Sequence, residues 1–131
     1  MNARIRLKSR LDDGGVFEEE YSGSYEVKGR YIRFEYKDGG GYTTHMTLCL
    51  EDSGMYKLFS DGERKLSIST VGGVGSAELT LGAHTLEGKI WELEAKAVPT
   101  LSGYKASVCY TLAFSEDMKN HTTLTIEAKN E

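Results

Sequence analysis

Hydrophobic and polar residues alternate along most of this chain, and the alternation is clearest at the N-terminus. From residue 3 to residue 11 every second side chain is small or apolar, and those between are Arg or Lys. This period of two is typical of a β-strand with one buried face. The turn composition "DDGG" follows, and "VFEEEYSGSYEV" then alternates in the same way. The two segments predict a β-hairpin.

The side chains of these two segments also predict a register for the hairpin. A three-residue loop at 13–15 sets apolar residues opposite apolar ones and basic residues opposite acidic ones. The predicted pairs are Leu11 with Phe17, Leu7 with Tyr21, Arg10 with Glu18, and Lys8 with Glu20. A shift of one residue would place apolar side chains against charged ones, so we expect a firmly specified register.

The same period continues to the C-terminus. Residues 31–37 place Ile32, Phe34 and Tyr36 inward, and residues 42–50 place Tyr42, Thr44, Met46, Leu48 and Leu50 inward. Further strands are predicted at 55–59, 64–70, 76–84, 86–98, 104–114 and 121–129, separated by turn compositions. Pro99 falls in a predicted gap between strands, "AVPTLSG", where its missing N–H does no harm.

A chain of short strands, each with one apolar face, forms a closed barrel or a sandwich. No segment has a convincing helical period. An up-and-down barrel is favoured because it leaves no exposed edges and needs only hairpin loops. We therefore predict an all-β fold: a single domain, 1–131, forming a small antiparallel, mainly up-and-down β-barrel of about eight to ten strands, with little or no helix.

Charge and composition narrow the choice of partners. The formal net charge of -4, with dispersed basic residues, argues against nucleic acid as a partner. The N-terminal segment lacks the apolar run of a signal peptide, and no apolar run reaches the roughly 18 residues of a membrane span. Cys49 and Cys109 have no metal-ligand spacing, so we interpret them as reduced thiols. We expect a soluble, intracellular protein without a membrane partner.

The glycine-rich stretch "TVGGVGSAELTLGAH", residues 70–84, resembles a phosphate-binding loop only at first sight. Such loops need a helix after the last glycine, and the Walker type also needs a lysine followed by Ser or Thr. Here Gly75 is followed by an alternating segment that predicts a strand. We interpret Gly72, Gly73 and Gly75 as a turn or sharp bend between neighbouring strands.

Candidate catalytic and metal-binding groups are sparse. The histidines, His45, His84 and His121, all have the polar parity of separate strands, and none has a His, Asp or Cys two residues away. No nucleophile elbow of the GxSxG kind is present. The carboxylates Glu18 and Glu20 are explained by their predicted basic partners. The sequence therefore predicts no catalytic residues, no metal site and no cofactor, and it favours a protein that is not an enzyme.

Two functions remain open from the residues. A small-molecule binding barrel would use bulky inward residues as an apolar wall with hydroxyl groups. Candidate lining residues are Phe17, Tyr21, Tyr25, Phe34, Tyr36, Tyr42, Arg64 and Tyr110. Arg64 is included because its parity matches Leu66 and Ile68, so it either reaches outward to solvent or meets an anionic head group. Alternatively the aromatic residues simply fill the barrel, and the protein acts through its surface, a strand edge or a homodimer interface.

The succession "GSYEVKGRYIRFEY", "YTTHMTLCLED", "GSAELTLGAHTLEG", "YKASVCYTLAF" and "NHTTLTIEAK" resembles the YwiB-like family of small bacterial proteins of unknown function. The resemblance spans almost the whole chain. It implies a calycin-like, lipocalin-related β-barrel, a cytoplasmic setting and a ligand cavity for a small apolar or amphipathic molecule. It carries over no catalytic residue. The stretch 57–70 is shorter than the family pattern, which leaves the strand count open in this region.

Overall fold

The computed structural model describes residues 1–12, 14–37, 41–50, 55–61 and 64–131, without the side chains of Asp61, Arg64, Lys65 and Met118. Ten strands account for most of these residues, and the described residues contain no helix. The strands are β1 (Asn2–Leu11), β2 (Val16–Lys28), β3 (Tyr31–Lys37), β4 (Thr43–Cys49), β5 (Tyr56–Asp61), β6 (Arg64–Val71), β7 (Val74–Leu81), β8 (His84–Thr100), β9 (Gly103–Ser115) and β10 (Met118–Asn130).

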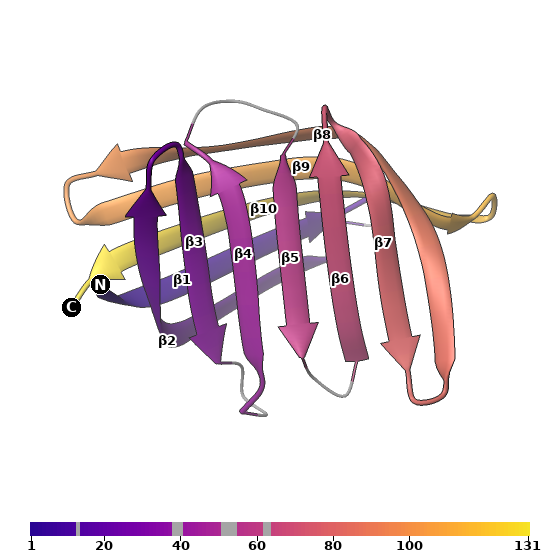
Figure 1. The fold of residues 1–131 in the computed structure, drawn as a ribbon, viewed down its shortest axis with the longest axis horizontal. Helices are drawn as coiled ribbons and strands as arrows, with labels where there is room; N and C mark the ends of the chain where they lie inside the picture. The colour runs from indigo at the N-terminus through magenta and orange to yellow at the C-terminus, as the bar shows by residue number, and fades with distance from the viewer. Residues whose placement is uncertain (13, 38–40, 51–54, 62–63) are drawn as a thin grey trace.

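Every strand pairs antiparallel with its neighbours in the sequence, and β1 pairs with β10 to close the ring. This is the all-β, up-and-down barrel that the alternation predicts, at the upper end of the expected strand count. In Figure 1, β3 to β7 stand side by side as one layer, and β8, β9, β10 and β1 run across behind them. The N- and C-termini lie close together at one side of the molecule. The barrel interior therefore lies between two crossed layers.

Two long strands carry the chain from one layer to the other. β2 pairs with β1 over residues 16–24 and with β3 over 23–28. At the change of partner, a Cβ on Gly23 would collide with the carbonyl oxygen of Glu35. In β8 the change occurs near a β-bulge between Trp91 and Glu94, where Glu92 has a positive φ of 55°. A glycine and a bulge are the usual devices for bending a strand at a barrel corner.

The predicted register of the first hairpin is wrong by two residues. Leu7 faces Glu19 rather than Tyr21, and Lys8 faces Glu18 rather than Glu20. The hairpin closes at Leu11 and Gly15, because the N–H of Leu11 donates to the carbonyl of Gly15 (2.9 Å), so Gly15 is not a loop residue as predicted. Asp13, which the prediction also places in the loop, lies outside the described residues. A shift of two residues keeps every side chain on its predicted face, so parity alone could not detect it. The resulting ion pairs are Arg4 with Glu20 (2.6 Å) and Arg6 with Glu18 (3.9 Å).

Gly72 and Gly73 form a turn between strands, as predicted, whereas Gly75 lies inside β7 and pairs with Thr70. Gly72 and Gly73 join β6 to β7, with φ angles of 66° and 85°. Two consecutive positive φ angles are characteristic of a type I′ hairpin turn. The carbonyl of Gly73 also accepts a hydrogen bond from the N–H of Leu93 (3.0 Å), which joins the turn to the β8 bulge.

Pro99 lies inside β8, not in a gap between strands as the sequence predicted. It faces Tyr104 in the β8–β9 ladder. Pairing of β8 with β7 ends at Ile90, so among the described strands residues 94–100 pair with β9 alone. A proline is tolerated on such an edge, because its missing N–H does not remove a ladder hydrogen bond there.

Candidate functional site

The predicted lining residues separate into two groups by burial. Tyr25, Phe34, Tyr36 and Tyr110 are at most 9% exposed and belong to the core. Tyr21 is half-buried and packs against that core. Phe17 and Tyr42 are 58% and 39% exposed, so neither is enclosed. The side chain of Arg64 lies outside the described part of the chain, so its predicted role stays a prediction.

The inner face of the barrel is packed to different degrees at its two ends. At one end, which we call the filled end, Ile32, Phe34, Leu48 and Ile126 are all 0% exposed. At the other end, inward-facing apolar residues remain half-buried or exposed. We call this set the apolar mouth: Phe17, Tyr21, Leu79, Leu86, Leu112 and Leu124.

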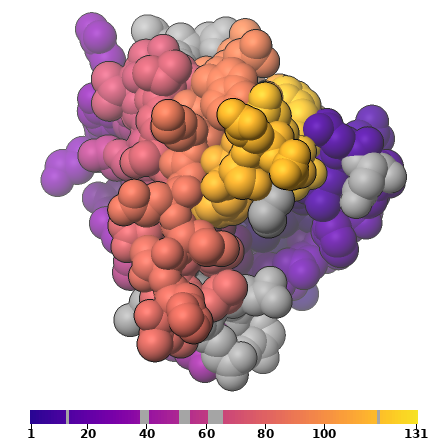
Figure 2. Space-filling model, turned by 90° about the vertical axis from the view of Figure 1, so that its right-hand side faces the viewer, coloured from indigo at the N-terminus to yellow at the C-terminus, as the bar shows by residue number. Residues whose placement is uncertain are grey.

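In the sequence, Phe17 follows the β1–β2 hairpin, Leu79 and Leu86 flank the β7–β8 hairpin, and Leu112 and Leu124 flank the β9–β10 hairpin. The β7–β8 and β9–β10 hairpins both lie toward the right-hand side of Figure 1. Figure 2 looks onto this side, and the surface recedes between the coral β7–β8 hairpin and the indigo β1–β2 hairpin. Leu86 is 43% exposed although it faces Leu79 across β7 and β8. An exposed patch of apolar side chains on an inner face is the kind of surface that a ligand or partner covers.

A cluster of tyrosines lies in the interior. Tyr56 is 0% exposed, and its ring packs on that of Tyr110 with centroids 6.3 Å apart. Its hydroxyl is buried without a hydrogen-bond partner among the described residues. An unpaired polar group in an apolar interior costs free energy. Such a group is therefore uncommon in a packed core and is expected where a ligand or water completes the site.

Burial raises the pKa of Tyr56 well above its ordinary value, and the neighbouring phenols of Tyr110 and Tyr36 raise it further. Burial also raises the pKa of Tyr110, against an opposing hydrogen bond with Thr122. These phenols therefore keep their protons at neutral pH. They can donate hydrogen bonds to an acceptor atom between them.

Aromatic rings connect this cluster to the rim. Tyr21 stacks on Tyr36 with centroids 5.2 Å apart and an interplanar angle of 7°. The hydroxyl of Tyr21 donates to a carboxylate oxygen of Glu19 (2.5 Å), and Glu19 is exposed. One hydroxyl group, that of Tyr21, therefore lies near the surface, and another, that of Tyr56, is buried in the interior.

Sequence reasoning did not select Tyr56 or Glu19 for this site. Tyr56 shares the parity of Leu58 in the predicted strand 55–59, so its inward direction was available from the sequence, but its missing partner was not. Glu19 stands within an acidic run that was interpreted through Glu18 and Glu20, its neighbours on the opposite face.

The outer face carries His45, His121 and both cysteines. The ring of His45 lies near Arg33 (2.9 Å) and Glu35 (3.6 Å). Both cysteines are free thiols, as predicted, and Cys109 contacts His121 across two strands. No cluster of three or more potential metal ligands occurs among the described residues. Within the described ranges there is also no helix long and apolar enough to cross a membrane.

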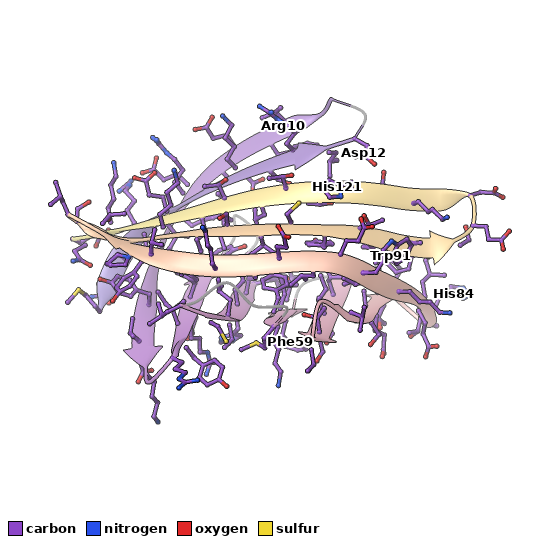
Figure 3. The ribbon with its side chains drawn as sticks, turned by 90° about the horizontal axis from the view of Figure 1, so that it is seen from above. Arg10, Asp12, Phe59, His84, Trp91 and His121 are labelled. Carbon is purple, nitrogen blue, oxygen red and sulfur yellow. The ribbon has the colours of Figure 1, made fainter. Side chains whose placement is uncertain are left out.

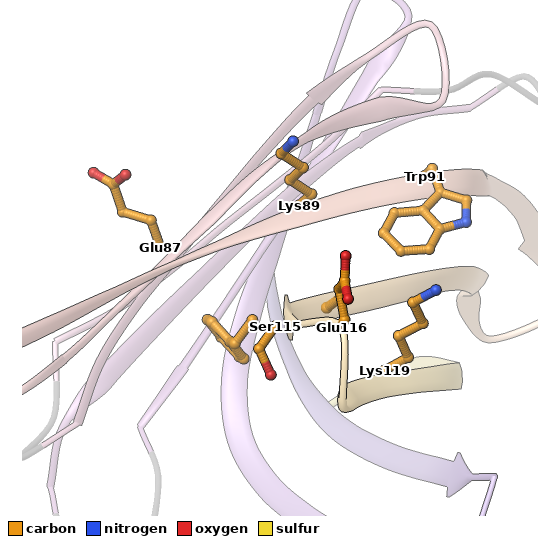
Figure 4. A pocket seen from close by; sticks show the side chains of 8 residues that line it. Glu87, Lys89, Trp91, Ser115, Glu116 and Lys119 are labelled. Atoms are coloured by element: carbon orange, nitrogen blue, oxygen red, sulfur yellow. The ribbon is translucent and has the colours of Figure 1, made fainter.

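A separate hollow of about 280 Å³ lies on the outer surface beside Trp91 (Figure 4). The ammonium group of Lys119 stands 5.9 Å from the centroid of the indole ring, a cation–π contact. The side chains of Glu87, Lys89 and Glu116 also line the hollow, which therefore carries charges of both signs. We place the candidate site at the apolar mouth instead, because none of the described residues that line this hollow has a buried polar group without a partner.

Comparison with known proteins supports the fold and leaves the function open. No protein-family model matches the chain, and no curated protein matches it. The crystal structure of the ywiB protein from Bacillus subtilis aligns with a TM-score of 0.72 and 20% sequence identity, over 98% of this chain and 92% of that one. The chain therefore has the YwiB fold over nearly its whole length, which confirms the YwiB-like architecture that its sequence resembles.

Proposed function

We propose that this protein is a small-molecule binding barrel whose ligand enters at the apolar mouth and reaches the tyrosine cluster. The observation that carries the proposal is the Tyr56 hydroxyl, which is fully buried and has no hydrogen-bond partner among the described residues. The inward-facing leucines of the apolar mouth are at the same time only partly covered. A hydrogen-bond acceptor on the ligand would satisfy the Tyr56 hydroxyl. The apolar body of the ligand would cover the leucines of the mouth.

The same residues favour a neutral head group over an anionic one. No described inward side chain near the cluster is cationic, and the carboxylate of Glu19 stands at the rim. The neutral phenols can donate hydrogen bonds but cannot balance a buried charge. We therefore infer an amphipathic ligand with an apolar body and a neutral acceptor, such as an alcohol or an amide.

The first experiment is native mass spectrometry of the gently purified protein, compared with its denatured spectrum. We expect a stoichiometric small-molecule adduct that is released on denaturation. The purified protein is then titrated with N-phenyl-1-naphthylamine, a neutral fluorescent probe, and 1-octanol and octanoate compete for the site. We expect the alcohol to displace the probe more strongly than the carboxylate.

A matched pair of variants ties this binding to the mouth. Phe17→Ser removes an apolar side chain at the rim, and Phe59→Ser removes one of similar exposure, 47%, from the outward face of β5. We expect Phe17→Ser to weaken probe binding about three- to tenfold, and Phe59→Ser to leave it unchanged. Equal effects of the two changes, with no adduct, would contradict the proposal.

The alternative is a protein with a filled barrel that acts through its surface or as a homodimer. It is favoured by the edge of β8, where residues 94–100 pair with β9 alone among the described strands. The native spectrum tests it in the same measurement, because a dimer mass without an adduct supports this alternative. We also propose that the chain is a member of the YwiB-like family, that it is related to the calycins and that it is located in the cytoplasm.

A further inference from the structure

A thiol and an imidazole meet on the outer face of β9 and β10. The Sγ atom of Cys109 lies 3.0 Å from Nε2 of His121. In the β9–β10 ladder His121 faces Thr111, two residues from Cys109, so the contact is diagonal. Figure 3 shows His121 on this face, near Asp12 at the end of the first hairpin. No sequence pattern along a single strand reveals this pair, because Cys109 and His121 are twelve residues apart and lie on neighbouring strands.

The surrounding groups hold the imidazole in place. Oγ1 of Thr111 lies 3.2 Å from Nδ1 of His121, and a carboxylate oxygen of Asp12 accepts a hydrogen bond from the His121 backbone N–H (2.8 Å). When Nδ1–H donates to Thr111, the lone pair of Nε2 faces the sulfur. This tautomer is the one in which His121 can accept the proton of the thiol.

A small hollow gives access to the sulfur. It has a volume of about 150 Å³ and lies between β8, β9 and β10 on the outer surface. Cys109 is half-buried on its wall, with Lys96, Glu94 and Ser107 nearby. Charged groups of both signs beside the sulfur suit a small zwitterionic molecule.

We propose that Cys109 is a site of reversible S-thiolation, activated by His121 and selective for small zwitterionic disulfides. Two independent observations support it: the contact between the thiol and the imidazole, and the charged hollow into which the sulfur opens. The site is separate from the barrel interior, because Cys109 points outward while its neighbour Tyr110 points inward. The inference therefore does not depend on the proposed ligand.

The chemistry is a thiol–disulfide exchange. Nε2 of His121 takes the thiol proton, and the Cys109 thiolate attacks one sulfur of the disulfide. A new S–S bond forms to Cys109 and the original S–S bond breaks. The departing thiolate receives the proton from the imidazolium. One disulfide is consumed and one is formed, so the small disulfide is the only oxidant required.

Cys49 provides an internal control. It is also a free, half-buried thiol on the outward face of its strand, β4, and it faces Tyr31 across the ladder. Among the described residues, no contact joins Cys49 to an imidazole. Two cysteines of similar exposure thus differ in the presence of a base.

The experiment incubates folded Cys49→Ser and Cys109→Ser variants with oxidised glutathione and follows the intact mass over time. We expect the Cys49→Ser variant, which keeps Cys109, to gain one glutathionyl group about ten times faster than the Cys109→Ser variant. Dithiothreitol should restore the original mass. Equal rates in the two variants would overturn the proposal.

A second set of variants tests the role of His121. His121→Asn in the Cys49→Ser background should lower the rate to about that of Cys49, while Thr111→Val should lower it less. Circular dichroism verifies that each variant is folded. Complete alkylation of the unfolded variant in denaturant verifies that its thiol is intact. A folded His121→Asn variant that reacts at the unchanged rate would also overturn the proposal.

Discussion

The filled end and the apolar mouth are built on the same strands from the same kinds of residue, yet they differ in burial. On β10, Ile126 is 0% exposed, while Leu124, two positions away on the same face, is only half-buried. On β2, Tyr25 is 8% exposed and Phe17 is 58% exposed. Inward direction is therefore a property of the strand, whereas burial depends on what the opposite layer places against it.

The largest expected effect on stability comes from shortening an inward-facing side chain at each end of the barrel. Ile126→Ala should lower the free energy of unfolding by about 2–5 kcal/mol, because the shorter side chain leaves a cavity at a position that is 0% exposed. Leu124→Ala should cost clearly less, since part of its surface already meets solvent. Urea denaturation of the two variants measures the difference. Equal losses would show that the mouth is as well packed as the filled end.

Alkaline pH should destabilise the protein through the tyrosine cluster. The pKa values of Tyr56 and Tyr110 are raised in the folded state, so the unfolded chain releases these protons first. Stability from these groups is present in full below their ordinary pKa of about 10 and falls as the pH rises above it. Urea midpoints measured across this range should decrease. A Tyr56→Phe variant, in which one of the two groups is absent, should lose less.

Removing the Tyr56 hydroxyl should raise the free energy of unfolding, whereas the truncations described above should lower it. Tyr56→Phe should stabilise the ligand-free protein by about 1 kcal/mol, because it removes a buried group that has no partner among the described residues. Tyr25→Phe is the matched control: its hydroxyl donates to Asn130 (2.5 Å), so its loss should cost about 1 kcal/mol. If Tyr56→Phe also weakens displacement of the probe by 1-octanol, the hydroxyl serves binding at a cost in stability.

The smallest effect is expected at the rim. Phe17→Ser should change the free energy of unfolding by no more than about 0.5 kcal/mol, because the side chain is already largely exposed. Thermal unfolding of Phe17→Ser and wild-type protein measures this. A large loss would place Phe17 in the core and remove the distinction between rim and interior. A small loss makes any weakening of probe binding attributable to the missing contact.

Much of the interior was predictable, and the particular failures have physical causes. Phe34, Tyr36 and Met46 point inward as their parity predicts, since alternation is a local property of extended chain. The first hairpin was misplaced by two residues because either register preserves parity, and the hydrogen bond from Leu11 to Gly15 decides between them. Pro99 was placed in a gap because the sequence does not reveal which side of β8 lacks a partner.

The candidate sites were less predictable than the fold. Tyr36 and Tyr110 point inward as their parity predicts, and their role in lining a cavity stays a prediction. Tyr56 matters because its hydroxyl has no hydrogen-bond partner among the described residues. Residue spacing along single strands does not reveal the contact between Cys109 and His121, because it depends on the β9–β10 register. Both features depend on pairs of residues that only folding brings together.

By itself the sequence determined the strands, the inward face of most of them and the turn at Gly72 and Gly73, because alternation and turn chemistry act between near neighbours in the chain. Tertiary structure alone decided which end of the barrel is filled, which phenol remains unpaired and which thiol meets an imidazole. These depend on closure of β1 onto β10 and on the bends at Gly23 and Glu92. Such contacts join distant segments, and their geometry is set by the two crossed layers.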